Sequence, residues 1–298
     1  MYDVIIIGGG PAGLSAALIL GRCLRKVLLI DNGKQRNLCS NALHGYLTRD
    51  GIPPAEFLKT SREELSQYKT VTILNDEAVT AEKSDSGFAV TVVDGSEHLS
   101  RKMLIATGVL DNIPKIEGIM DFYGKSVHTC PYCDAWELRD KVIAVYGKDE
   151  RGFKLSLSLR NWSKDIILFT DGVCDIPPKD REKLIRNNVK LIEEKISRLE
   201  GSDGKIESIL LDDGERISCH AMFFNTESFI RSKLLEQLEC EFDHVNGVQS
   251  GKYESTNVPG LYVAGNICRE VQLVIVAAAE GAEAAFGINT LLTQEDRS

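Results

Sequence analysis

The feature that most constrains this chain is a glycine cluster that directly follows a short apolar run at the N-terminus. Residues 4–7 are all apolar, as expected of a strand buried on both faces. A G-x-G-x-x-G turn occupies residues 8–13, and an Ala- and Leu-rich helical pattern follows over residues 14–24. A second apolar strand, residues 27–30, ends at Asp31. This order predicts a βαβ unit of the kind that binds a dinucleotide.

Each residue of this motif has a separate physical role. Gly8 makes the tight turn, Gly10 lets the backbone approach a pyrophosphate, and Gly13 lets the helix and the strand pack closely. The N-terminus of the helix faces the phosphates, and Asp31 accepts hydrogen bonds from a ribose. A glycine-rich turn without a ligand is the alternative, but the flanking strand, helix and acidic residue favour a dinucleotide site.

A second strand–glycine turn–helix pattern occurs later in the chain. An apolar strand over residues 103–106 precedes a hinge over residues 112–114. A strand over residues 142–146, a glycine turn over 147–152 and a helix over 153–162 follow. The sequence therefore predicts an α/β fold with a weak internal repeat of one nucleotide-binding unit.

Composition agrees with a globular protein of about two domains. The chain has 298 residues, of which 43% are hydrophobic and 27% are charged. Acidic residues outnumber Lys and Arg by 44 to 35, and the net charge of −9 argues against nucleic acid as the main partner. No apolar run approaches the roughly 20 residues of a membrane helix, and the N-terminal apolar run lacks the basic region of a signal peptide. We expect a cytoplasmic protein without a membrane partner.

One pair of cysteines, Cys130 and Cys133, has the C-x-x-C spacing. A zinc site would need a second pair of ligands at a suitable spacing, so we expect no metal. A redox dithiol is favoured, because a two-residue spacer allows a small, reversible disulfide ring. Two unrelated buried thiols remain the alternative. The other cysteines are scattered singly, at positions 23, 39, 174, 219, 240 and 268.

Two polar residues flank this pair. Asp134 follows Cys133 at once and is a candidate to give and take protons during thiol exchange, with a turn cap as the structural alternative. His128 lies two residues before Cys130 and is a candidate to favour its thiolate. The remaining histidines fit surface or structural roles better than catalytic ones.

The chain resembles the low-molecular-weight thioredoxin reductase family of FAD flavoproteins. The resemblance rests on motifs that occur in one order: the glycine turn, Ala106-Thr107-Gly108, Cys130-Pro131-Tyr132-Cys133-Asp134, the segment Gly260 to Asn266, and a last helix over about residues 271–292 that is rich in Gly and Ala. The stretch from Arg36-Asn37 through His44-Gly45 and Asp50-Gly51, together with Tyr132, is more similar to a branch that contains dithiol oxidases and related reductases.

The resemblance implies two Rossmann-like domains, the second inserted into the first, in a homodimer. Residues 1–112 and 245–298 would form the FAD-binding domain, and residues 113–244 would form a nicotinamide-domain-like insert that carries the C-x-x-C. The implied FAD-binding residues are Gly8, Gly10, Pro11, Ala12, Gly13, Asp31, Asn32, Arg36, Asn37, His44, Ala106, Thr107, Gly108, Gly265, Asn266 and Gln272.

The resemblance also implies individual roles. Asn266 stands where the family usually has an aspartate facing the ribityl chain, and Gln272 would approach the isoalloxazine. Cys133 would lie nearest the flavin, Cys130 would attack an external disulfide, and Asp134 would move protons.

The second glycine turn departs from the family pattern. Asp149 occupies the position of the glycine at which the backbone approaches the pyrophosphate, and Glu150 adds a second negative charge. The next strand is followed by Thr170-Asp171-Gly172, with no arginine placed for a 2′-phosphate. The sequence therefore predicts weak use of nicotinamide, and of NADPH in particular.

We interpret the chain as an FAD-dependent disulfide oxidoreductase that moves electrons between FAD and the Cys130–Cys133 pair. Its partner would be a thioredoxin-like protein or a small disulfide or dithiol, and its electron donor a protein such as a ferredoxin. A dithiol oxidase that uses oxygen and a non-catalytic FAD redox sensor stay open as alternatives.

Overall fold

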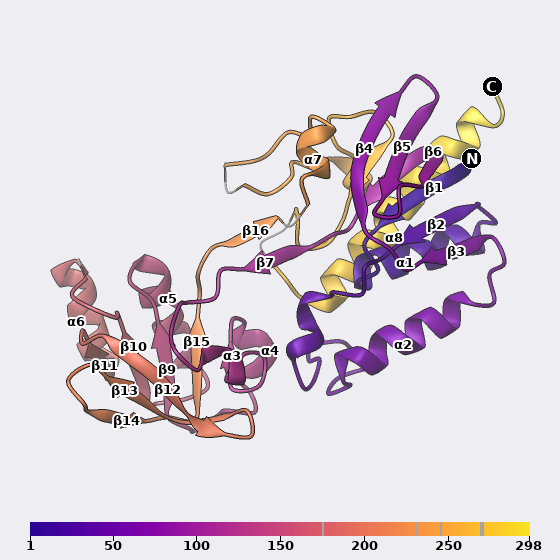
Figure 1. Ribbon diagram of the computed structural model, residues 1–298. Helices are drawn as coiled ribbons and strands as arrows, with labels where there is room; N and C mark the ends of the chain where they lie inside the picture. Colours follow the sequence, from indigo (N-terminus) through magenta and orange to yellow (C-terminus); the bar gives the residue numbers. More distant parts are fainter. Residues whose placement is uncertain (175, 231, 245, 269–270) are drawn as a thin grey trace. The chain divides into compact units, whose positions relative to one another are not determined.

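The computed structural model describes residues 1–174, 176–230, 232–244, 246–268 and 271–298. They divide into two compact units (Figure 1). Unit 1 comprises Met1–Leu38, Gly45–Leu110 and Phe229–Ser298, and unit 2 comprises Cys39–His44 and Asp111–Ser228. The chain returns to unit 1 at Phe229, earlier than the boundary at residue 245 expected from the sequence.

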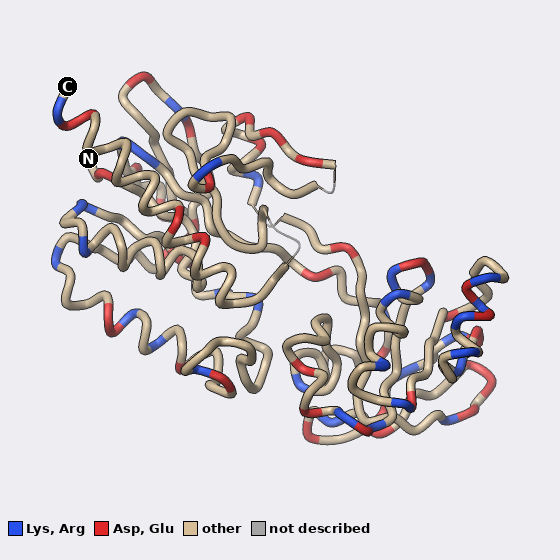
Figure 2. Tube along the Cα trace, turned by 180° about the vertical axis from the view of Figure 1, so that it is seen from behind, with Lys and Arg blue, Asp and Glu red and all other residues tan. Residues whose placement is uncertain are grey.

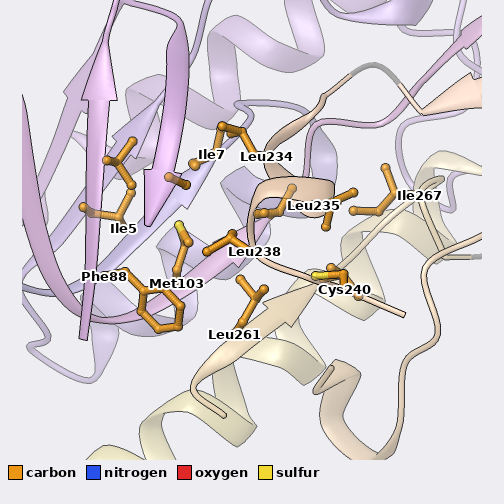
Figure 3. Packing of buried hydrophobic residues seen from close by; sticks show 14 of the residues in the cluster. Ile5, Ile7, Phe88, Met103, Leu234, Leu235, Leu238, Cys240, Leu261 and Ile267 are labelled. Atoms are coloured by element: carbon orange, nitrogen blue, oxygen red, sulfur yellow. The ribbon is translucent and has the colours of Figure 1, made fainter. Parts of the chain in front are cut away.

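The early return has a packing reason. Helix α7, Leu234–Gln237, places Leu234 and Leu235 in the same buried cluster as Ile7 and Met103 of the unit 1 sheet (Figure 3). Both leucines are almost fully removed from solvent. Burial of a leucine side chain stabilises a fold by about 1.5–3 kcal/mol, so this short segment folds with unit 1 although it follows the inserted part of the chain.

Unit 1 is built on a mixed sheet of strand order β3-β2-β1-β6-β5-β4, with β17 paired to β6. The β1–β2, β2–β3, β1–β6 and β6–β17 pairs are parallel, whereas the β4–β5 and β5–β6 pairs are antiparallel. The strands are β1 (Tyr2–Ile7), β2 (Val27–Ile30), β3 (Val71–Leu74), β4 (Ala78–Ser84), β5 (Gly87–Val92), β6 (Glu97–Ile105) and β17 (Leu261–Val263).

Small residues allow the helices of unit 1 to pack closely. Helix α1 (Pro11–Arg22) lies against α8 (Val274–Glu295), and a Cβ on Gly281 of α8 would collide with the backbone carbonyl of Ala12 (Figure 1). The remaining short elements of this unit are η1 (Arg36–Cys39, whose last residue falls in unit 2), α2 (Pro54–Leu65) and η2 (Lys252–Glu254). The start of α8 brings the Gly265 turn next to the glycine turn that precedes α1.

By length and composition α8 could cross a membrane, since its most apolar window has a mean hydropathy of 1.3. The helix contains Glu280 and Glu283, and its buried residues face α1 and the sheet. In the structure 39% of that window is buried, and packing within unit 1 explains the apolar character of this buried part.

Unit 2 repeats the architecture with a parallel sheet of order β11-β10-β9-β15-β8. A separate antiparallel sheet has the order β12-β13-β14, and β7 pairs with β16 where the chain passes between the units. The strands of unit 2 are β8 (Val127–His128), β9 (Ile143–Tyr146), β10 (Ile166–Phe169), β11 (Val189–Ile192), β12 (Ile196–Ser202), β13 (Lys205–Leu211), β14 (Arg216–Ser218) and β15 (Ala221–Phe224). Strands β7 (Val109–Asp111) and β16 (Ser228–Ile230) each have two residues in unit 1 and one in unit 2. The helices are α3 (Ile119–Phe122), α4 (Pro131–Asp134), α5 (Glu150–Leu159) and α6 (Pro178–Arg186).

Charged residues of both signs are interspersed along both units (Figure 2). On α6, for example, Lys183 pairs with Asp180 at 3.1 Å and Arg186 pairs with Glu182 at 3.0 Å. Exposed pairs of this kind contribute about 0–1 kcal/mol each, so the two buried cores of each unit dominate its stability.

Candidate functional site

A cavity of about 500 Å³ lies within unit 1, over the carboxyl ends of its parallel strands. Ligands of open α/β sheets bind at this edge. Fourteen of the sixteen residues expected to bind FAD line it: Gly8, Gly10, Pro11, Ala12, Asp31, Asn32, Arg36, Asn37, Ala106, Thr107, Gly108, Gly265, Asn266 and Gln272. The fold thus brings together segments that are far apart in the sequence.

The three glycines of the turn have the distinct environments that the motif requires. Gly8 has φ +109°, and a Cβ there would collide with the carbonyl of Ala106, which directly follows β6. Gly13 does not line the cavity. It packs against the turn instead, where a Cβ on it would collide with the carbonyl of Gly8. Gly10 differs from both, since a Cβ on it would meet no atom within 4 Å. The open space at Gly10 faces the cavity and suits a phosphate at the helix N-terminus.

Asp31 is buried and makes more contacts than the sequence predicted. Its Oδ1 accepts a hydrogen bond of 3.0 Å from the backbone N–H of Gly9, and Gln35 Nε2 donates to Oδ1 and Oδ2 at 2.9 and 2.8 Å. Arg62 of α2 forms an ion pair with Oδ2. Sequence reasoning missed Gln35 and Arg62. No local pattern marks Arg62, because its contact depends on how α2 packs.

The opposite part of the cavity also carries polar groups suited to a cofactor. Thr107 Oγ1 is buried and has no hydrogen-bond partner among the described residues. Arg36 Nη1 donates to Gln272 Oε1 at 2.6 Å, and Gly265 N–H donates to the buried carboxylate of Glu280 at 2.7 Å. These residues fit a dinucleotide with an extended polar linker. Sequence reasoning also missed Asp76 and Glu77, which line the cavity beside Asn32.

His44 lies outside the cavity. It belongs to the segment that clusters with unit 2, and its Nε2 lies 3.7 Å from Glu137 Oε1. Its expected part in binding FAD therefore has no support in the geometry of unit 1.

Cys130 and Cys133 form a disulfide with a Cα–Cα distance of 5.3 Å. Cys130 is the N-cap of α4, and the backbone N–H groups of Cys133 and Asp134 donate to its carbonyl at 3.2 Å. Two aromatic side chains beside the pair are largely exposed, Tyr132 at 75% and Trp136 at 63%. The pair therefore lies at an accessible surface of unit 2, with the Asp134 carboxyl at the end of the same turn.

The glycine turn of unit 2 is closed by its own side chains. Asp149 caps α5, and its Oδ1 accepts from the backbone N–H groups of Arg151 at 2.9 Å and Gly152 at 3.4 Å. Lys148 Nζ lies 2.8 Å from Asp171 Oδ2, and this carboxylate raises the pKa of Lys148. The amides that a pyrophosphate would use thus already have an anionic partner.

Comparison with known proteins gives one consistent result. Residues 2–281 match the family described as Pyridine nucleotide-disulphide oxidoreductase. The thioredoxin reductase aclD of Aspergillus oryzae is 28% identical, over 100% of this chain and 98% of its own length.

Two solved structures are similar along nearly the entire chain. TrxB from Bacillus anthracis superimposes with a TM-score of 0.95 at 32% identity, covering 99% of this chain and 100% of that chain. HlmI has a TM-score of 0.94 at 33% identity, covering 99% of this chain and 93% of that chain. These likenesses confirm the α/β fold with two Rossmann-like domains and the resemblance to thioredoxin reductases.

Proposed function

Because this chain belongs to the pyridine nucleotide-disulphide oxidoreductase family and is a flavin-dependent disulfide oxidoreductase of the thioredoxin reductase type, we propose that its Cys130–Cys133 pair exchanges electrons with FAD without NADPH as donor. The substrate class in this proposal is a thioredoxin-like protein or a small disulfide. The proposed setting is a cytoplasmic homodimer.

The residues of unit 1 hold the cofactor in this proposal. The open position at Gly10 would admit the pyrophosphate, and Asp31 and Asn266, which also line the cavity, would bind the adenosine ribose and the ribityl chain. Bound FAD supplies two-electron redox chemistry. Thr107 Oγ1, which is buried in the cavity wall, gains a hydrogen-bond partner when the site is filled.

The residues of unit 2 carry the substrate chemistry. The thiol of Cys130 forms a mixed disulfide with the substrate, and Cys133 resolves it as the two enzyme sulfurs rejoin. Asp134 receives and returns the protons of this exchange. The exposed rings of Tyr132 and Trp136 offer an aromatic surface to a protein or small-molecule disulfide, and the Arg139 guanidinium lies 4.5 Å from the centre of the Trp136 ring.

The observation that carries the proposal about the donor is the Asp149 cap of α5. A pyrophosphate would have to displace this carboxylate or approach it. Two like charges about 4 Å apart repel by roughly 4 kcal/mol near a protein surface. Asp171 already pairs with Lys148, whose Nζ lies 2.8 Å from Asp171 Oδ2, so this lysine is held by a carboxylate of the chain and NADPH is disfavoured more than NADH; the proposed donor is a reduced protein of the ferredoxin type.

Anaerobic flavin reduction tests this proposal directly. The purified holoenzyme is mixed separately with NADPH, NADH and a reduced ferredoxin, and the flavin absorbance is followed by stopped flow. We expect little reduction by micromolar NADPH within seconds and full reduction by the protein donor. Full reduction by NADPH within seconds would contradict this proposal and identify the protein as an ordinary NADPH-dependent reductase.

A dithiol oxidase is the second candidate function, and the same Asp149 cap favours it. If nicotinamide does not deliver electrons, substrate thiols can deliver them to the Cys130–Cys133 pair, and oxygen can accept them. Oxygen consumption driven by a small dithiol, in the absence of any reductase partner, identifies this direction. A non-catalytic redox sensor would show neither activity.

A further inference from the structure

A buried histidine lies against the carboxyl group beside the redox pair. His128 Nδ1 is 3.3 Å from Asp134 Oδ1, and the His128 side chain is 8% exposed. His128 ends strand β8 and Asp134 ends helix α4, so the two residues bracket the Cys130–Cys133 segment. The contact between these two side chains therefore ties the Asp134 end of the redox turn to strand β8 of the unit 2 sheet.

The imidazole is held in place by its surroundings. His128 is in parallel register with Phe223 of β15, and the two rings pack with centroids 5.3 Å apart and an interplanar angle of 36°. Phe223 is fully buried. Because the His128 side chain is buried and packs against the Phe223 ring, few of its rotamers are available. The imidazole therefore presents Nδ1 to Asp134 in a fixed direction.

We propose that His128 is a positioning residue, which fixes the Asp134 carboxylate as the proton acceptor and donor for thiol exchange at Cys130 and Cys133. This inference rests on the redox role of the pair in the proposed function. It extends that role to His128, which acts through Asp134, and it explains why a histidine is buried at this point of the strand.

The exchange balances with an external dithiol as the reductant. Its first thiol loses a proton to Asp134 and attacks the Cys130–Cys133 disulfide, which breaks as a mixed disulfide forms, and the leaving sulfur takes that proton. The second external thiol then gives its proton to Asp134 and attacks the external sulfur of the mixed disulfide. That disulfide bond breaks as the external sulfurs join in a cyclic disulfide, and the released enzyme sulfur takes the proton. Two electrons and two protons pass from the external sulfurs to the two enzyme thiols, and the His128–Asp134 pair is returned unchanged.

The experiment measures this exchange without using the flavin as the readout. The oxidised holoenzyme is mixed with dithiothreitol, quenched with acid at millisecond intervals and alkylated, and the reduced Cys130 and Cys133 are counted by mass spectrometry. Loss of a general acid–base group lowers a rate by about 10²–10⁴-fold, so we expect Asp134→Asn to slow the exchange about 100-fold. We expect His128→Leu to slow it about tenfold.

Two further variants separate positioning from a structural role. Asn can place its amide Nδ2 near the site of the imidazole Nδ1, so His128→Asn should stay within about threefold of the wild type. The double variant His128→Leu/Asp134→Asn should be no slower than Asp134→Asn alone, because a positioning residue has nothing left to position. His220→Leu, at an exposed histidine of the same unit, is the matched control and should leave the rate unchanged.

The outcomes distinguish the two proposals. If dithiothreitol fails to reduce the wild-type pair, the redox role in the proposed function is wrong. If the wild type reacts but His128→Leu is equally fast, or if the double variant is about 1,000-fold slower through additive effects, His128 does not position Asp134. A fall in the melting temperature of unit 2 without a change in the exchange rate would also contradict the proposal.

Discussion

The carboxylate of Asp149 lies 2.9 Å from the backbone nitrogen of Arg151, at the position where a nucleotide-binding turn has a glycine. Backbone N–H groups at a helix N-terminus require an acceptor, and either a ligand phosphate or a side chain can provide it. In unit 2 a side chain provides it. The fold of a nucleotide-binding unit is therefore retained while its anion site is filled from within the chain.

Removal of this cap should destabilise unit 2. Replacement of an Asp N-cap by Ala costs about 0.5–2 kcal/mol, whereas Asn caps nearly as well. We expect Asp149→Ala to lower the free energy of unfolding of unit 2 by about 1 kcal/mol and Asp149→Asn to change it by less than about 0.5 kcal/mol. Urea unfolding followed by the fluorescence of Trp136 and Trp162 measures this. Lys154→Ala is the control, since it removes the exposed pair with Glu150 and leaves the N-terminus of α5 unchanged.

The same residue should limit dinucleotide binding. We expect Asp149→Gly to bind NADH at least about tenfold more tightly than the wild type, because it frees the amides of Arg151 and Gly152 and removes one negative charge; tenfold corresponds to about 1.4 kcal/mol. NADPH should gain less, because Asp171 still holds Lys148 and no arginine directly follows β10 for a 2′-phosphate. Fluorescence titration of the reduced nicotinamide gives both dissociation constants. Micromolar binding of NADPH to the wild type would contradict the role assigned to Asp149.

Gly10 and Gly13 form a matched pair for testing the cofactor cavity. Gly10 has φ −80° and open space at its Cβ position, so Gly10→Ala should fold normally yet weaken FAD binding at least about tenfold. Gly13→Ala should instead cost about 2 kcal/mol of stability, because its methyl group collides with the carbonyl of Gly8. Flavin content after dialysis and the unfolding midpoint of the apoprotein distinguish the two effects. Unchanged flavin affinity in Gly10→Ala would place the pyrophosphate elsewhere.

The parts of this site that the sequence could predict are local. Gly8, Gly10 and Gly13 act through a strand–turn–helix geometry that is encoded within about a dozen residues, and the lining of the cavity agrees with the family pattern. The ion pair between Asp31 and Arg62 joins β2 to α2 and depends on helix packing, so no spacing in the sequence indicates it.

The same reasoning explains the other differences. Leu234 and Leu235 belong to a four-residue helix whose only signal is burial in unit 1, and this is why the domain boundary was expected at residue 245. The contact between His128 and Asp134 spans few residues, but its significance comes from Phe223, which β15 brings beside it from far along the chain. The domain boundary and the role of the His128–Asp134 contact both depend on long-range packing, which no local sequence motif indicates.

Cys133 should be necessary for disulfide turnover and unnecessary for cofactor binding. The cavity is lined by residues of unit 1 alone, so Cys133→Ser should retain the wild-type flavin content while its turnover of a disulfide substrate falls to background. Flavin absorbance and a thiol-release assay on the same preparation measure both. Cys23→Ser, at an exposed cysteine of unit 1 outside the pair, is the control and should keep its activity. Normal turnover by Cys133→Ser would exclude the pair as the redox centre.

Two buried cysteines should be inert at neutral pH. Burial raises the pKa of Cys219 to about 12 and that of Cys240 to about 11, and the thiolate is the reactive form. At pH 8 we expect iodoacetamide to label exposed Cys23 at least about 100-fold faster than Cys219, since each pKa unit lowers the thiolate fraction about tenfold. Labelling followed by peptide mass spectrometry gives the two rates, and equal rates would contradict the burial of Cys219.

The raised pKa values of Cys219 and Cys240 also set the sign of a pH effect on stability. Above about pH 9 the unfolded chain loses protons that the folded thiols retain, so the free energy of unfolding should fall as pH rises from 9 toward 12. Cys219→Ala, which removes one of these thiols from the core of unit 2, should make this fall shallower, and an unchanged slope would mean that other groups control alkaline unfolding.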